Sequence, residues 1–323
     1  ACDTSGNCSA KLDKNEYLVG SPPPQFVNKV DVPHTFTISV WKDEGNGLIS
    51  AVHNPDPDPT NDVIPEILFS GGTVNVIENT CATGTDTNGQ CTVTINSSDP
   101  GPFSVSANVD INVNGVQLQR DTDGQFGNSL EATKIYVDAS LSLDNGGYVQ
   151  AGVEKTIIAT VQKDPGTGFV NAEGEEVILT LTPPDGATSD DYQITSNTCT
   201  IDPVTGQGGT DANGNCALTF ISYVTGVYQV SAAATVNVQG LDIDLATNDV
   251  TVTVVDGSIT LQSMYPSQEV GSNNTLTVTV KQDTGGVPSA VIDAPVIITL
   301  DDKFGASSTP DDVNGGTCST PVV

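Results

Sequence analysis

Seven cysteines carry the clearest chemistry in this sequence, because six of them lie in repeated surroundings. Three end an Asp-x-x-Gly-x-Cys motif, and these are Cys8, Cys91 and Cys216. Three directly follow a threonine, and these are Cys81, Cys199 and Cys318. The Asn-Gly pairs before Cys91 and Cys216 are strong turn signals. We therefore predict that Cys81–Cys91 and Cys199–Cys216 are disulfides, each closing one loop and stabilising the fold by about 3 kcal/mol.

Metal binding is the competing chemistry for these thiols. Structural zinc sites draw on Cys-x-x-Cys pairs and histidines. This sequence has no Cys-x-x-Cys and only 2 His, so disulfides are the better prediction. Because disulfides form and persist in oxidising compartments, the cysteines predict an extracellular or cell-surface location.

The remaining cysteines leave alternatives open. Cys2 and Cys8 are close enough in sequence to form a third disulfide, which leaves Cys318 as the odd one. An unpaired cysteine in a secreted protein needs a partner elsewhere. The partner of Cys318 lies either beyond the given sequence or in another subunit. In the second case, a Cys318–Cys8 bond between neighbouring copies would recreate the pattern of the two internal loops.

A run of oxygen-bearing side chains at residues 53–62 offers a second kind of chemistry. Asp56, Asp58 and Asp62 supply carboxylates, which hard cations such as calcium prefer. The run does not follow the Asp-x-Asp-x-Asp-Gly loop pattern, and its prolines favour an extended, solvated loop instead. Calcium binding at these three aspartates is a hypothesis, and we predict no other cofactor.

Catalytic patterns are missing from the sequence. His34 and His53 take no part in a Ser-His-Asp or Cys-His arrangement, and no His-Glu-x-x-His motif is present. The many carboxylates include no pair that the sequence marks out. We therefore predict that the protein is not an enzyme.

The groups named above must be positioned by a repeated set of short strands. Three segments alternate apolar and polar side chains with the period of two that indicates a half-buried strand. They are residues 34–40, 155–161 and 274–280, spaced 121 and 119 residues apart. Further matching segments, at 176–181 with 295–300 and at 101–107 with 226–232, lie before and after the cysteine loops. Because no stretch shows a convincing 3.6-residue period, the sequence predicts an all-β protein.

The order of these motifs resembles bacterial immunoglobulin-like tandem domains of the invasin and intimin type. The resemblance rests on a strand ending in a Lys/Gln-Asp turn, a Val-Ile-Leu-Thr-Leu strand, a Thr-Asp-x-Asn-Gly-x-Cys hairpin and a Gly-x-Tyr/Phe-x-Val-Ser-Ala strand. It covers essentially the whole chain and implies tandem β-sandwiches of about seven strands each. The motifs belong to the fold and carry no catalytic signature, and a shared fold does not imply a shared function.

Equivalent junctions divide the chain into three copies. Val137-Asp138-Ala139-Ser140 and Val255-Asp256-Gly257-Ser258 mark them, which predicts immunoglobulin-like domains at residues 1–138, 139–256 and 257–323. The junctions lack a Gly/Ser-rich or Pro-rich linker, so we expect the sandwiches to form a stiff rod. Residues 257–323 match only the first half of a copy. We expect either that the protein continues beyond them or that another chain supplies the missing strands by β-augmentation.

Charge narrows the range of partners. The chain has 10 Lys and Arg against 40 Asp and Glu, a formal net charge of −30. The resulting repulsion argues against nucleic acid and against anionic membrane surfaces, and no apolar stretch is long enough for membrane insertion. We expect the partners to be further copies of the same protein or further repeats of the same chain.

These observations predict a structural extracellular rod, either the stalk of a cell-surface adhesin or a subunit of an extracellular filament. The alternative is a binding module that recognises a host receptor, another surface receptor or a glycan. Its contacts would come from two insertions that only the first copy carries, at residues 20–33 and 53–62.

Overall fold

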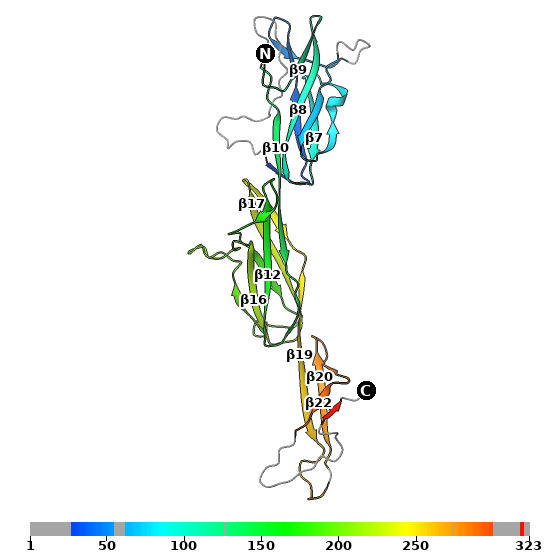
Figure 1. Cartoon of the computed structure of the whole chain (residues 1–323), viewed down its shortest axis with the longest axis vertical. Helices are drawn as coiled ribbons and strands as arrows, with labels where there is room; N and C mark the ends of the chain where they lie inside the picture. The colour runs from blue at the N-terminus through cyan, green and yellow to red at the C-terminus, as the bar shows by residue number, and fades with distance from the viewer. Residues whose placement is uncertain (1–26, 55–61, 126, 273, 300–316, 320–323) are drawn as a thin grey trace.

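The computed structural model describes residues 27–54, 62–125, 127–272, 274–299 and 317–319. Within these ranges the regular elements are β-strands, apart from one short 3-10 turn at Thr80–Thr83. The prediction of an all-β protein is confirmed. Figure 1 shows the strands gathered in three units that follow one another along the long axis of the molecule. Within the described residues, no helix has the length and apolarity needed to cross a bilayer.

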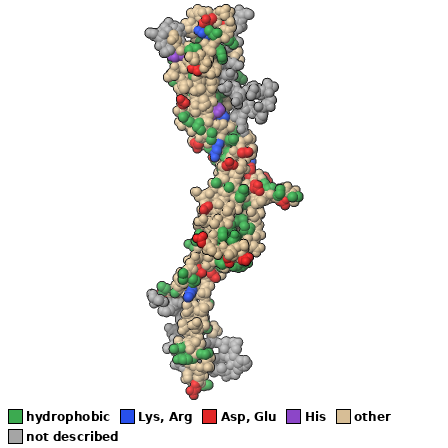
Figure 2. Space-filling model, turned by 180° about the vertical axis from the view of Figure 1, so that it is seen from behind, with side chains coloured by type: hydrophobic (Ala, Val, Ile, Leu, Met, Phe, Trp, Pro, Cys, Tyr) green, Lys and Arg blue, Asp and Glu red, His purple; other side chains and the backbone are tan. Residues whose placement is uncertain are grey.

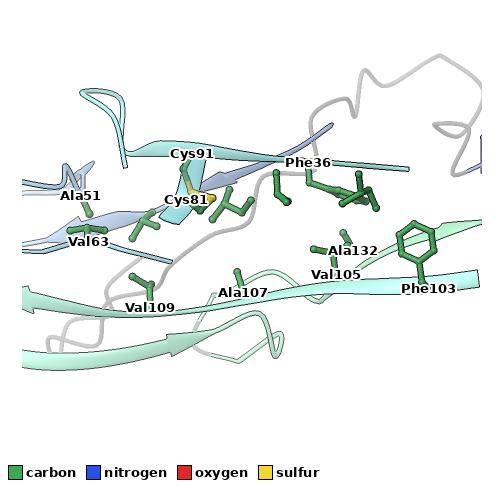
Figure 3. Packing of buried hydrophobic residues seen from close by; sticks show 14 of the residues in the cluster. Phe36, Ala51, Val63, Cys81, Cys91, Phe103, Val105, Ala107, Val109 and Ala132 are labelled. Carbon is green, nitrogen blue, oxygen red and sulfur yellow. A yellow bond between two sulfur atoms is a disulfide. The ribbon is translucent and has the colours of Figure 1, made fainter. Parts of the chain in front are cut away.

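The first unit, here called the N-terminal sandwich, packs a three-stranded sheet in the order β2–β7–β6 against a layer built on β8. Its strands are β1 (Val27–Lys29), β2 (His34–Ser39), β3 (Trp41–Asp43), β4 (Leu48–Ser50), β5 (Glu66–Gly71), β6 (Asn75–Asn79), β7 (Gln90–Asn96), β8 (Gly101–Val113), β9 (Val116–Asp121) and the first half of β10 (Ala132–Leu143). Strict alternation along β7 buries Cys91, Val93 and Ile95. Figure 3 shows this core between the two layers, with the Cys81–Cys91 disulfide on one side and Phe103 and Val105 on the other.

The second unit, the central sandwich, repeats this arrangement. Its strands are the second half of β10, β11 (Gly147–Gln150), β12 (Glu154–Asp164), β13 (Val170–Asn171), β14 (Ile178–Thr182), β15 (Tyr192–Asn197), β16 (Asn215–Ser222), β17 (Gly226–Val238), β18 (Leu241–Ala246) and the first half of β19 (Val250–Ser263). One layer has the order β15–β16–β12–β10 and the other contains β14–β17–β19. The alternating residues Ile157, Ala159 and Val161 of β12 are fully buried between them.

The third unit, the C-terminal hairpin, is thinner. It contains the second half of β19, β20 (Leu276–Asp283), β21 (Ser289–Ala290), β22 (Pro295–Ile297) and β23 (Thr317–Ser319). β19 and β20 pair in antiparallel register from Asp256 opposite Asp283 to Ser263 opposite Leu276. In the described part of this unit, β22 and β23 form a separate two-stranded sheet in which Val296 is 5% exposed, whereas Ile259 and Leu261 of β19 are 64% and 59% exposed.

Two long strands each belong to two units. The first half of β10 pairs with β8 and its second half with β12. The first half of β19 pairs with β17 and its second half with β20. The domain boundaries predicted at residues 138 and 256 therefore fall inside continuous strands, and the division into three domains stays a prediction.

Candidate joints and assembly surface

A turn closed by one aspartate lies at each joint between units. At the end of β12, the Asp164 carboxylate accepts hydrogen bonds from the backbone N–H groups of Gly166, Thr167 and Gly168, at 2.8, 3.0 and 2.9 Å. At the end of β20, the Asp283 carboxylate accepts one from the N–H of Gly285 at 2.9 Å. This backbone donor is the main reason that the pKa of Asp283 is lowered, because it stabilises the ionised form.

Each of these turns rests on a glycine of the preceding unit. A Cβ placed on Gly166 would lie 3.1 Å from Cγ2 of Ile135 and 3.3 Å from Cα of Gly101. A Cβ placed on Gly285 would overlap the backbone of Gly226. Gly166 and Gly285 both have a φ of +95°, a region that glycine adopts without strain. Close approach and backbone conformation together therefore require glycine at both joints.

The same turn is formed a third time at the far end of the N-terminal sandwich. There the Asp43 carboxylate accepts hydrogen bonds from the N–H groups of Gly45 at 2.7 Å and Gly47 at 3.0 Å. Gly45 has a φ of +99°, and no described atom lies within 4 Å of where its Cβ would be. The turn thus has the same shape whether or not a neighbouring unit rests on it.

The cysteine loops have the predicted bonds. Cys81 is bonded to Cys91 and Cys199 to Cys216, with all four side chains buried. In the second hairpin, the Asp211 carboxylate accepts hydrogen bonds from the N–H groups of Asn213 at 2.8 Å and Asn215 at 2.9 Å. The first hairpin repeats this with Asp86, whose pKa is lowered mainly by the backbone N–H of Gln90.

The two disulfide loops differ in length. The bonded cysteines are 10 residues apart in the first loop and 17 in the second. The longer loop projects from the central sandwich in Figure 1. The Asp202 carboxylate organises it by accepting a hydrogen bond from the N–H of Val204 at 2.7 Å, while the Val204 side chain is 90% exposed.

The calcium hypothesis is only partly within the described residues. Asp56 and Asp58 lie outside them, as do Cys2 and Cys8. Asp62 is described, and its Oδ1 lies 3.4 Å from Nδ1 of His53. In the described part of the chain, no three His, Cys, Asp or Glu side chains are grouped so that they could hold a metal ion. Calcium stays a prediction, as do the binding roles of residues 20–33 and 53–62.

Lys134, which the sequence analysis did not identify, is unusual among the described charged residues because its side chain is buried. It is 3% exposed on β10, opposite Phe103, and burial lowers its pKa to about 8. No described residue forms a hydrogen bond or ion pair with its ammonium group. Burial, and secondly the charge of Lys134, lower the pKa of His34 to about 4. The register pairs of β10 and β19 place Val252 at the equivalent position of the central sandwich, and comparing the two copies would have identified the lysine.

No protein-family model and no curated protein matches the sequence. Among solved structures, the chain is similar to the D0-D1 domain of intimin, with 22% identity, 71% of this chain and 95% of that chain covered, and a TM-score of 0.23. It is also similar to InvD of Yersinia pseudotuberculosis, with 13% identity, coverage of 84% and 72%, and a TM-score of 0.26.

A third similar structure is invasin, described as a bacterial integrin-binding protein, with 12% identity, coverage of 82% and 61%, and a TM-score of 0.24. These are the kinds of protein that the strand and hairpin motifs resemble. At such identities and TM-scores the likeness carries no argument about function, which has to come from the chain itself.

Proposed function

We propose that this protein is a structural rod on the outside of the cell, serving as the stalk of a surface adhesin or as a subunit of an extracellular filament. The observation that carries the proposal is the continuity of β10 and β19 through the joints. Rods that must bend have linkers whose backbone dihedrals are free. Here the residues at each joint are held by hydrogen bonds to neighbouring strands on both sides.

The glycine contacts support the same proposal. A turn of one unit rests on the backbone of the unit before it, at Gly166 on Gly101 and at Gly285 on Gly226. Such a contact limits the angle between units, because backbone atoms are less adaptable than long side chains. The proposed domains are residues 1–138, 139–256 and 257–323, stacked end to end.

The disulfides and the surface charge are consistent with an extracellular location. Both disulfides support this location, because such bonds form and persist in oxidising compartments. Figure 2 shows Asp and Glu side chains distributed along the length of the molecule, with few Lys and Arg. At physiological ionic strength repulsion between exposed charges is screened beyond about 8 Å, so this coat keeps neighbouring rods soluble without forcing them far apart. Further copies or repeats of the same protein are the proposed partners.

Small-angle X-ray scattering and electron microscopy of single particles test the rod. We expect one extended shape with a narrow spread of angles between units. Inserting four Gly/Ser residues between Asp138 and Ala139 should widen that spread and shorten the mean end-to-end distance. The control is the same insertion next to Val204 in the projecting loop, which should leave both quantities unchanged. A wide spread of angles in the unaltered protein would contradict the proposal.

A further inference from the structure

The C-terminal hairpin has an open strand edge where the central sandwich has a closed one. In the central sandwich, residues 154–160 of β12 pair with β16, on the edge opposite β10. The equivalent strand β20 pairs with β19 on one edge, while on the other only Lys281 and Gln282 pair, with β21. Among the described residues, none pairs with residues 276–279 on that edge. These are the positions that match 157–160 of β12.

The sheet face beside that edge is apolar and only partly buried. Leu276, Val278 and Val280 are half-buried, and Ile259 and Leu261 on β19 are mostly exposed. Removing aliphatic side chains of this size from water is favourable, so a strand that covered them would be stabilised by their burial. A long hydrophobic edge strand left open is a template for pairing with another chain.

The central sandwich shows what kind of strand covers such a site. Cys216 of β16 lies opposite Ala159 and is bonded to Cys199, whose carbonyl accepts a hydrogen bond from the N–H of Val177. In the C-terminal hairpin, Val296 takes the place of Val177, and Cys318 lies opposite it in register. In backbone register Cys318 therefore occupies the position of Cys199, and the described residues of this unit include no counterpart of the strand that carries Cys216.

One segment of this chain has the sequence of that strand. Residues 3–8 repeat the Asp-x-x-Gly-x-Cys motif of residues 211–216. If the following residues were extended as a strand, Cys8, Ala10 and Leu12 would share one face. This alternation matches Cys216, Leu218 and Phe220, which are the buried residues of β16. Residues 3–12 lie outside the described residues, so the match is one of sequence.

We propose that residues 8–12 of one copy add as an antiparallel strand to β20 of a second copy, where Cys8 forms a disulfide with Cys318. The register of β12 and β16 places Cys8 opposite Val278 and Ala10 opposite Leu276. It also places Asn7 opposite Thr279, a pair identical to Asn215 and Thr160, whose side chains are hydrogen-bonded at 2.8 Å. The occupant is a second copy because β1 and β20 lie in units that the whole central sandwich separates (Figure 1).

Charge and redox chemistry fit this assembly. Two of the 10 basic residues in the chain, Lys11 and Lys14, lie in or next to the added strand, so the segment escapes the repulsion that the rest of a −30 chain would meet. The bond forms by thiol–disulfide exchange. The Cys8 and Cys318 thiols lose two protons and two electrons, and a low-molecular-weight disulfide such as oxidised glutathione takes them up as two thiols. The inference rests on the proposed filament function and identifies its contact.

Non-reducing electrophoresis tests the disulfide. The full chain, incubated at micromolar concentration in a glutathione redox buffer, should form a ladder of covalent multimers that collapses on reduction. Cys8→Ser and Cys318→Ser should each abolish the ladder, and the Cys2→Ser control should retain it. A ladder or dimer that survives Cys8→Ser, or the absence of any ladder with Cys2 bonded to Cys8 in peptide maps, would overturn the proposal.

A peptide probe tests the strand register without relying on the folding of variants. A fluorescent peptide of residues 3–14 should couple to the full chain through Cys318 and stop the ladder from growing. Changing Leu12, on the inward face, to Asp should reduce the initial coupling rate at least tenfold, whereas changing Ser9, on the outward face, to Asp should change it less than twofold. Equal rates for both peptides would show simple thiol exchange and overturn strand addition. Scattering from reduced, monomeric protein tests the rod separately, so either idea can fail alone.

Discussion

β12 and β20 carry the same alternating pattern and lie in different surroundings. Ile157, Ala159 and Val161 of β12 are fully buried, whereas their counterparts on β20 are half-buried beside mostly exposed residues of β19. Both strands pair with a long strand that arrives from the previous unit. The difference lies in the second layer, which β14, β17 and β19 supply to the central sandwich. A strand's own sequence thus sets its conformation, and the strands that face it set its burial.

The largest effect should come from removing matched core side chains. We expect Ile157→Ala to lower the free energy of unfolding of the central sandwich by about 3–4 kcal/mol, because a cavity replaces a fully buried side chain. Leu276→Ala, at the equivalent position of β20, should cost less than about 1 kcal/mol in the dilute monomer. Urea denaturation measures both. Equal costs would mean that β20 is covered in solution and would contradict the difference in burial between β12 and β20.

Removing the disulfides should have the next largest effect on the free energy of unfolding, and the loss should differ between the three units. Replacing Cys199 and Cys216 with Ala should cost about 3 kcal/mol, since the open chain gains conformational entropy when unfolded. The pair Cys81 and Cys91 should cost a few tenths less because it closes a shorter loop. Cys318→Ala should change the melting temperature of the monomer by less than about 1 °C. Calorimetry of the three variants checks this order, and a large loss with Cys318→Ala would reveal a partner within the monomer.

The N-terminal and central sandwiches differ at a matched buried position, which is Lys134 in the first and Val252 in the second. We expect Lys134→Met to stabilise the protein by about 1–2 kcal/mol at pH 7, since it removes a buried charge that no described group pairs. The folded pKa of about 8 lies below the ordinary value of 10.5, so the unfolded chain binds the extra proton between these values. The free energy of unfolding therefore rises between about pH 8 and pH 10.5, as the buried lysine loses its proton, and falls again when the pH is lowered through this range.

Melting temperatures measured across this pH range test the sign. The rise should disappear in Lys134→Met and persist in Lys281→Met, which alters an exposed lysine on β20. A rise that survives Lys134→Met must come from another group.

The smallest effects on stability should come from the glycines of the three aspartate-closed turns. Gly45→Ala should cost about 1 kcal/mol, because alanine at a positive φ is strained. Gly166→Ala and Gly285→Ala should carry the same strain and also move the units apart, because the added Cβ meets the backbone of the preceding unit. Scattering should show a changed end-to-end distance for these two variants and none for Gly45→Ala. Identical scattering for all three would mean that the glycine contacts do not set the angle.

Much of the fold could be predicted from the period-two pattern and the turn motifs. The turns predicted at Asn88-Gly89 and Asn213-Gly214 directly precede β7 and β16. Such turns can be predicted because their conformation depends on the local sequence. The joints could not be predicted in this way. Asp138 and Asp256 mark the places where one unit gives way to the next, and the sequence led us to expect ends there. The alternation nevertheless continues on both sides, so the chain passes through as one strand.

The contacts at the joints depend on which surfaces meet, and one strand's sequence does not contain that information. Gly101 and Gly226 read as ordinary turn residues until the turns of the next unit are placed on them. Lys134 was missed for a related reason. The alternation of residues 134–138 places it on the inner face with Tyr136, but a pattern search for apolar residues passes over a lysine at such a position.

The shared strands have a consequence for how the molecule is made. When the N-terminal sandwich closes, β10 is already fixed by its pairing with β8, and its second half extends outward as a preformed edge. The next sandwich can begin on that edge, with the register of β12 set by a strand that has no freedom to slip. A chain that emerges N-terminus first can therefore fold in the order of its emergence, each finished unit serving as the template for the one behind it.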